Sequence, residues 1–276
     1  MTRRIFYILL TLVFILLLSR LINIEEVGSA IQGVKWSFVI LGVFLGFISS
    51  FIAILRLKLL FNRVSSLSIK FIWAVGYLAS LVSLLLPFYV GGFGAASIFS
   101  KKAGISYSKS FGILFVDFFL GVLLTLILGF IGIYYFYQKR LLTLKLVDWN
   151  WIVVFGFTLL IAIIALLILK SKYKKIENFF LKMKDSFNIL KTILFIKAVF
   201  LTVLVAVFGF AASYFFFIAF GIKPPLVDFI LASSIFGILG LIPGAFAKIG
   251  QYETFAVLTL PYLLSEDPTR VFSVVL

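Results

Sequence analysis

The sequence predicts an all-α, polytopic membrane protein with about seven or eight membrane segments. Of its 276 residues, 63% are hydrophobic and 13% are charged, whereas a soluble domain has roughly 25% charged residues. The mean hydropathy is +1.24. Apolar stretches of about 20 residues, the length that spans a bilayer as a helix, follow one another along the chain. We therefore expect a single transmembrane domain over residues 1–276, located in the cell membrane.

Composition excludes several kinds of chemistry. The chain has no cysteine and no histidine, so disulfides, nearly all zinc sites and the commonest general base are excluded. The net charge is +15 at pH 7, but the cationic residues fall in the connectors between apolar stretches. That placement is typical of contact with anionic lipid headgroups. We therefore expect membrane phospholipids as partners, with no nucleic acid, metal or cofactor, and a homo-oligomer is left open.

The first half of the chain contains four apolar segments. Residues 5–22 begin like a signal peptide, but no small-residue cleavage site follows, so they are interpreted as a retained first helix. The next three segments are 36–55, 71–86 and 110–136. Residues 56–70 are interpreted as a short basic connector between the second and third segments.

Residues 83–102 interrupt this pattern. Proline removes a backbone donor and clustered glycine makes a helix costly, so the third segment is expected to break there. The residues that define the break are Pro87, Gly91, Gly92, Gly94, Lys101 and Lys102. Irregular backbone at membrane depth must be buried in protein or bathed in water, which predicts a re-entrant segment. Free N–H groups of the glycines beside the lysine pair would suit a phosphate; close helix packing is the alternative for the glycines.

A second break is predicted at residues 241–253. The residues that define it are Pro243, Lys248, Gly250 and Glu253. Its spacing from proline to glycine equals that from Pro87 to Gly94. Two broken segments in corresponding halves are typical of a transporter's binding site, so we expect the two breaks to meet, as in an internal inverted repeat. A simple surface turn is the alternative for the second break.

The rest of the second half alternates spanning and interfacial segments. Residues 151–169 and 192–220 are expected to span. The lysine-rich residues 170–191 carry apolar side chains at helical spacing and are expected to lie in the interface plane, with a solvated hairpin as the alternative. The helix opened by Pro224 and Pro225 should carry Asp228 in its first turn, a favourable place for an anion. Residues 254–264 are too short to span, and the last helix, begun near Ser265, is incomplete at Leu276.

The distribution of cationic residues supports the re-entrant interpretation. If every segment simply crosses, lysine and arginine are shared almost evenly between the two sides. If residues 71–100 instead dip in and return, sixteen collect on the side of the N-terminus and six on the other. Because cytoplasmic loops carry the excess of lysine and arginine, the N-terminus is predicted to be cytoplasmic.

Asp117 is the clearest candidate for a functional group inside the membrane. It lies about seven residues, roughly 10 Å, into the fourth segment. Ionisable residues there are costly and are functional candidates by default, so Asp117 is expected to face the interior of the bundle. The alternative is a carboxylate near the interface that pairs with Lys109 or a neighbouring lysine.

Four short motifs occur in an order that resembles a known family. They are Arg56-Leu57-Lys58-Leu59-Leu60, Leu86-Pro87 through Gly91, Gly104-Ile105-Ser106 leading to Ser110, and Ile242-Pro243-Gly244 through Gly250 to Glu253. The chain resembles the transmembrane region of lysylphosphatidylglycerol synthases, also seen as stand-alone flippase-like proteins. The resemblance implies movement of lipids, such as aminoacylated phosphatidylglycerol, between leaflets. It implies no synthesis, because the aminoacyl-transferase domain is not within this sequence.

The sequence therefore predicts a lipid translocase and no enzyme. Its expected headgroup site comprises Arg56, Pro87, Gly91, Gly92, Gly94, Lys101, Lys102, Asp117, Pro243, Lys248, Gly250 and Glu253. The acyl chains are expected to stay in the bilayer. The alternatives are a membrane-embedded enzyme on a lipid-linked substrate, with Asp117 or Glu253 as base, a solute transporter, and a structural subunit that transports nothing.

Overall fold

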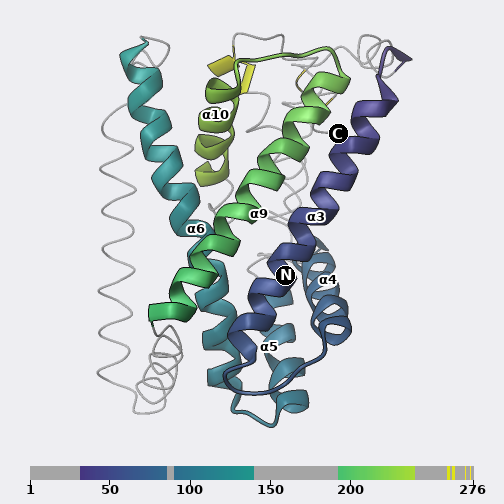
Figure 1. Ribbon diagram of the computed structural model, residues 1–276, viewed down its shortest axis with the longest axis vertical. Coiled ribbons are helices and arrows are strands. Elements are labelled where there is room, and N and C mark those ends of the chain that lie inside the picture. Colours follow the sequence, from purple (N-terminus) through teal and green to yellow (C-terminus); the bar gives the residue numbers. More distant parts are fainter. Residues whose placement is uncertain are drawn as a thin grey trace, which may run out of the picture.

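The structure is a computed structural model that describes residues 32–85, 90–139 and 192–239, together with positions 260, 261, 263, 264, 271 and 274. Within these ranges it contains six helices with defined bounds and no strand (Figure 1). Three of them are long and apolar enough to cross a membrane: α3 (Trp36–Phe61), α6 (Tyr107–Gln138) and α9 (Thr192–Ala219). The others are α4 (Ile69–Leu85), α5 (Val90–Ala103) and α10 (Leu226–Leu239). The all-helical membrane architecture is confirmed.

Several predicted segments lie outside the described residues. They are the first helix at 5–22, the segments at 151–169 and 170–191, the second break at 241–253, and the start of the last helix. They stay predictions.

The helices α3 and α9 form an antiparallel pair. The backbone N–H of Lys35, before α3, donates to the carbonyl of Ala219 at the end of α9 at 3.0 Å, and the Ser49 hydroxyl donates to the carbonyl of Val205 at 2.9 Å. Gly42 lies so close to α9 that a Cβ there would be 3.1 Å from the Ala212 oxygen. Small residues at such contacts let two helix backbones approach each other.

The end of α3 differs from the prediction. Residues 56–61 were expected in a basic connector, but they continue the helix to Phe61, and Arg56, Leu57, Leu60 and Phe61 are buried. No proline or glycine interrupts this stretch. Its apolar side chains pack into the core, and the charge of Arg56 is neutralised inside the bundle, so nothing forces the helix to end at residue 55.

The glycine-rich stretch is also helical, contrary to the expected loop. Helix α5 begins at Val90 and includes Gly91, Gly92 and Gly94. Gly91 and Gly92 are buried, so the propensity cost of glycine, about 1 kcal/mol per residue, is offset by close packing. Residues 86–89, between α4 and α5, lie outside the described residues.

Helices α4 and α5 pack as an antiparallel hairpin. Phe99 near the end of α5 contacts Phe71 at the start of α4, with ring centroids 5.8 Å apart, and Phe61 of α3, at 4.8 Å. The start of α4 and the end of α5 therefore lie at the same end of the bundle, the lower end in Figure 1. The geometry agrees with a segment that enters and returns. The side of the membrane on which it lies stays a prediction.

Helices α6 and α10 form a second antiparallel pair. Ser106 caps α6, its hydroxyl oxygen accepting from the Lys109 N–H. Gly132 of α6 faces the backbone of α10, where a Cβ would be 2.9 Å from the Leu231 oxygen. At the end of α6, the Tyr135 hydroxyl donates to Asp228 at 2.7 Å. Asp228 lies in the first turn of α10, as predicted.

Candidate functional site

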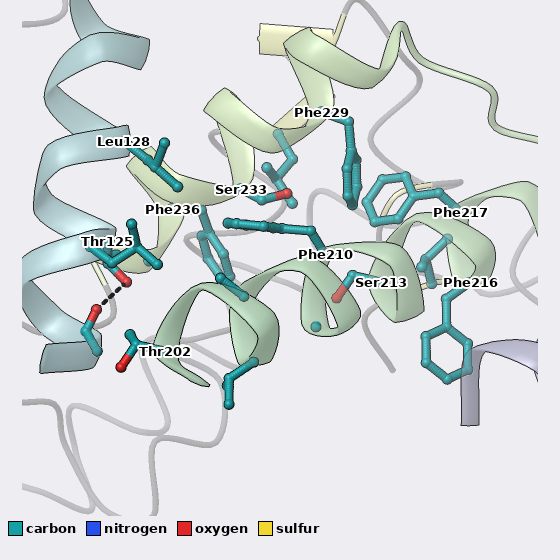
Figure 2. Close-up of a pocket in the computed structure, with 18 of the residues that line it drawn as sticks. Thr125, Leu128, Thr202, Phe210, Ser213, Phe216, Phe217, Phe229, Ser233 and Phe236 are labelled. Atoms are coloured by element: carbon teal, nitrogen blue, oxygen red, sulfur yellow. Dashed lines mark hydrogen bonds between the residues drawn. The ribbon is translucent and has the colours of Figure 1, made fainter. Parts of the chain in front are cut away.

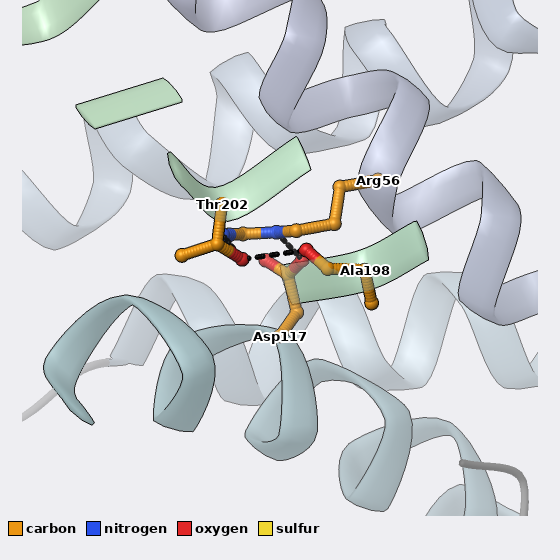
Figure 3. Close-up of polar contacts among 4 residues, drawn as sticks. All are labelled: Arg56, Asp117, Ala198 and Thr202. Carbon is orange, nitrogen blue, oxygen red and sulfur yellow. Dashed lines mark hydrogen bonds and ion pairs between the residues drawn. The ribbon is translucent and has the colours of Figure 1, made fainter. Parts of the chain in front are cut away.

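Three helices meet at a buried ion pair. Arg56 of α3 donates from Nε to Oδ1 of Asp117 on α6 at 2.7 Å, and from Nη1 to the hydroxyl oxygen of Thr202 on α9 at 2.9 Å (Figure 3). The Arg56 side chain is 8% exposed and that of Asp117 is 21% exposed. A charge buried at membrane depth needs such partners because hydrocarbon provides none. The pair therefore ties α3, α6 and α9 together.

Thr202 is oriented for this role by its own helix. Its hydroxyl donates to the carbonyl of Ala198 at 2.8 Å, one turn earlier. The proton is thereby committed to the backbone, so the oxygen presents a lone pair to the guanidinium of Arg56. Figure 3 shows the Thr202 oxygen joined by dashed lines to both Ala198 and Arg56.

The ion pair lies deep along the helices. Asp117 is the tenth residue after Tyr107, the first of α6, and Thr202 is the tenth after Thr192, the first of α9. Ten residues correspond to roughly 15 Å at a rise of 1.5 Å per residue, and Arg56 lies five residues, roughly 8 Å, before the end of α3 at Phe61. The depth exceeds the predicted 10 Å because α6 begins three residues before position 110.

A cavity of about 580 Å³ extends from this ion pair between α6, α9 and α10 (Figure 2). Its wall is largely apolar, with phenylalanine side chains from α9 and α10 and leucines from α6. Among the described residues that line it, Arg56 alone is charged. The polar residues of the wall besides Arg56 are Thr125, Thr202, Ser213 and Ser233. The cavity is therefore amphipathic, with a cation near one end and an aromatic wall elsewhere.

Each helix contributes one face to the cavity. The lining residues of α6 are Gly121, Leu124, Thr125 and Leu128, and those of α10 are Phe229, Ser233, Phe236 and Gly237. Both sets recur every three or four residues, the spacing of a single helical face. On α9 the lining residues extend from Thr202 to Phe217, fifteen residues or roughly 22 Å. The cavity is consequently elongated along the bundle.

Gly121 makes part of this space. A Cβ at Gly121 would meet no atom of the described chain within 4 Å, although the residue lies in the middle of α6 and lines the cavity. Gly237, on the opposite wall, is different, because a Cβ there would be 2.8 Å from the methyl group of Thr125. Glycine at position 121 therefore leaves part of the cavity empty, whereas glycine at position 237 permits close contact between α10 and Thr125 of α6.

A family model described as the lysylphosphatidylglycerol synthase TM region matches residues 4–275, nearly the whole chain. The chain belongs to this family. The family predicted from the four sequence motifs is thereby confirmed. No curated protein and no solved structure matches the chain.

In this lysylphosphatidylglycerol synthase TM-region protein, two predicted site residues come together. Asp117 faces the interior of the bundle, as predicted, and its partner is Arg56 rather than Lys109 or a neighbouring lysine. Arg56, named from a motif in a presumed connector, lies instead within α3 and lines the cavity.

Other predicted site residues lie elsewhere or outside the described residues. Lys101 and Lys102 are exposed in the last turn of α5, and Gly91, Gly92 and Gly94 belong to the same helix, none of them among the residues that line the cavity. The remaining positions lie outside the described residues: Pro87, Pro243, Lys248, Gly250 and Glu253. The meeting of the two breaks therefore stays a prediction.

Sequence reasoning missed Thr202 and the phenylalanine wall. A single hydroxyl in an apolar helix and phenylalanines at helical spacing occur equally in ordinary packed helices. The only available signal was on α9, where Thr202, Gly209 and Ser213 fall on one face of an otherwise apolar segment. Such a polar face indicates that this side of α9 lines a cavity and does not contact lipid.

Proposed function

We propose that this protein translocates phospholipids between the leaflets of the membrane, with headgroups that are anionic or aminoacylated. The observation that carries the proposal is the amphipathic cavity inside the bundle, with the guanidinium of Arg56 at membrane depth. A purely structural subunit needs no such cavity. Family membership supports the same function.

The chemistry of the cavity suits a phospholipid. The barrier to flipping arises because a charged headgroup must cross hydrocarbon, which solvates it poorly. Arginine offers several N–H donors in a planar fork that matches the oxygens of a phosphate, and it stays charged when buried. Asp117 keeps Arg56 neutralised while no lipid is bound, so the empty site does not hold an unpaired charge.

The proposal includes no chemical step. The Asp117 carboxylate accepts a hydrogen bond from Arg56 at 2.7 Å and is held as its counter-ion. A general base would take a proton from a substrate, and translocation requires no such transfer. Asp117 is accordingly assigned to holding Arg56 in place.

Translocation is testable in proteoliposomes that contain tail-labelled fluorescent phosphatidylglycerol or its lysyl ester. Dithionite bleaches the outer leaflet, and the rate at which inner-leaflet fluorescence is then lost measures flipping. The variant Arg56→Gln/Asp117→Asn removes both charges together, because removing one alone leaves a buried unpaired charge. We expect at least a tenfold slower rate in this variant than in the wild type.

A matched control is Lys139→Gln/Asp228→Asn, which removes the ion pair at the end of α6 (3.0 Å) away from Arg56. This variant should flip lipids at the wild-type rate. A wild-type rate equal to that of protein-free vesicles would refute the proposal, and so would unchanged flipping in a folded Arg56→Gln/Asp117→Asn variant.

A further inference from the structure

We infer that the phenylalanine-lined cavity binds a hydrocarbon chain of the transported phospholipid, with the anionic head of that lipid at Arg56. The inference rests on the proposed function and deepens it. It differs from the expectation that all acyl chains stay in the bilayer during translocation. The ligand chemistry is an anionic head on a long hydrocarbon chain.

The head of the ligand is identified by the free donors of Arg56. A guanidinium has five N–H donors, and two atoms of Arg56, Nε and Nη1, donate to Asp117 and Thr202. Within the described residues, no group accepts from Nη2, and Arg56 lines the cavity. An oxyanion is the ligand group that such a donor binds best.

The tail of the ligand is identified by the apolar wall of the cavity. Beyond Arg56 and Thr202, the lining is dominated by aromatic and aliphatic side chains, including Phe210, Phe229 and Phe236 (Figure 2). The hydroxyl of Thr125 donates a hydrogen bond to the carbonyl of Gly121 at 3.1 Å. Such a surface releases water readily and binds hydrocarbon, at about 25 cal/mol per Å² of apolar surface buried.

The shape of the cavity favours a chain over a compact ligand. Its lining extends over fifteen residues, roughly 22 Å, on α9, and over seven and eight residues, roughly 10–12 Å, on α6 and α10. Because its volume of about 580 Å³ is spread over the length of the α9 lining, the cavity has a narrow cross-section. A volume of this size lies within the usual range for small-molecule sites, about 300–1,000 Å³.

Photolabelling in membranes tests the inference directly. The probe is phosphatidylglycerol with a diazirine in the middle of one acyl chain, incorporated into proteoliposomes of the wild-type protein. Leu128 lines the cavity, and its neighbour Ile127 is 48% exposed on the outside of the same helix. Because both residues lie in one peptide, tandem mass spectrometry compares cavity and outer surface at one depth without a difference in recovery.

We expect Leu128 to be labelled at least as strongly as Ile127 in the wild type. The Gly121→Leu variant fills the empty volume and should lower the ratio of Leu128 to Ile127 labelling at least fivefold. Gly76→Leu is the matched control, because a Cβ at Gly76 also meets no atom of the described chain within 4 Å but Gly76 does not line the cavity. Labelling of Ile127 without Leu128 in the wild type would overturn the inference, whatever the folding of the variants.

Two further probes identify the source of the chain. Diacylglycerol with the same diazirine lacks an anion and should label Leu128 at least fivefold less; equal labelling would overturn the role of Arg56. A diazirine fatty acid shares the anionic head, so labelling by the fatty acid and not by phosphatidylglycerol would overturn the assignment to a phospholipid. Flipping is measured in the same vesicles. Flipping without Leu128 labelling refutes only this inference, whereas Leu128 labelling without flipping refutes only the proposed function.

Discussion

Arg56 and Asp117 show how a membrane bundle accommodates two opposite charges at depth. Their ion pair is nearly enclosed, and a second nitrogen of the guanidinium, Nη1, donates to Thr202 at 2.9 Å. Desolvation of the two charges costs several kcal/mol per ion, which the pair recovers only through close contact and further hydrogen bonds. Removing one partner leaves the other charge buried without compensation.

We therefore predict unequal effects of single and double substitution on stability. Asp117→Asn alone should destabilise the protein by about 3 kcal/mol or more, because it leaves Arg56 buried without a counter-ion. Arg56→Gln/Asp117→Asn should be more stable than Asp117→Asn. Denaturant or thermal unfolding in detergent measures both values, and a double variant at least as unstable as the sum of its two single variants would contradict this account.

The second ion pair of the described bundle lies in a different environment. Lys139 donates to Asp228 at 3.0 Å and lies over the ring of Tyr135, with its side chain 42% exposed. Hydrogen bonding with Tyr135 and, next, with Asp228 raises the pKa of Lys139 above its ordinary value of 10.5. The charged form of Lys139 is thus favoured in the folded state.

The sign of this shift predicts a pH dependence. A raised folded-state pKa gives stability that is fully present below the ordinary lysine value and is lost as pH rises through the folded-state value. The difference in melting temperature between wild type and Lys139→Met should therefore be constant from pH 6 to 9 and shrink at about pH 10.5 and above. A difference that shrinks between pH 6 and 9 would show that another group titrates instead.

Of the two residues in the buried ion pair, the sequence predicted Asp117 better than Arg56. Asp117 lies in the middle of an apolar segment, where the cost of a charge makes it conspicuous. Arg56 lies near the end of an apolar run, followed by Lys58, and so has the appearance of a connector residue. Nothing in the sequence alone states that α3 continues to Phe61.

Glycine serves two opposite purposes along α6. Gly129 and Gly132 are buried against α10, where Gly132 faces the backbone of Leu231 and Gly129 the side chain of Ile238. Gly121, nearer the start of the helix, faces the cavity. The same residue type therefore brings α6 and α10 together at one level and keeps a space open at another.

We predict that Gly132→Ala destabilises the protein by about 1–3 kcal/mol, because its Cβ would be forced against another helix's backbone. The contact distance would be 2.9 Å to the Leu231 oxygen, which cannot move without shifting α10. Gly121→Ala should be neutral or stabilising, since alanine has the higher helix propensity. Thermal unfolding of both variants in one detergent measures the difference, and equal stabilities would disprove the distinction.

Helix α5 is an element that local helix propensity fails to predict. Three glycines within four residues predict an irregular segment, yet Gly91 and Gly92 are buried inside a helix. In a membrane bundle, small residues gain stability from packing that no propensity scale includes. Within the predicted break at residues 83–102, residues 83–85 belong to α4 and residues 90–102 to α5, so this part of the prediction was wrong. The long apolar segments α3, α6 and α9 were predictable because they follow from hydropathy.

Within the part of the bundle that the structure describes, cationic side chains gather at one end. The end where α3 and α5 finish and α4 and α6 begin carries Lys58, Arg63, Lys70, Lys101, Lys102 and Lys109. At the opposite end the described lysines are Lys35, Lys139 and Lys223, and Asp228 offsets one of them. Figure 1 shows the two ends at the bottom and top of the view. From the positive-inside rule we predict that the first end faces the cytoplasm.

The hairpin of α4 and α5 makes this assignment testable by single-cysteine labelling. The natural chain has no cysteine, so each introduced thiol is a unique reporter. Lys70→Cys and Lys102→Cys lie at the two feet of the hairpin, both exposed, and Lys223→Cys lies exposed at the other end. A membrane-impermeant maleimide added to intact cells should label Lys223→Cys alone, whereas permeabilised cells should allow labelling of all three.

The reason for this expectation is the geometry of the hairpin. Helices α4 and α5 run antiparallel and return the chain to its starting side, and at 17 and 14 residues both are shorter than the about 20 residues that a spanning helix needs. Labelling of Lys70→Cys and Lys102→Cys from opposite sides would mean that the hairpin opens in the membrane and crosses it, and the excess of cationic residues on the cytoplasmic side would then disappear.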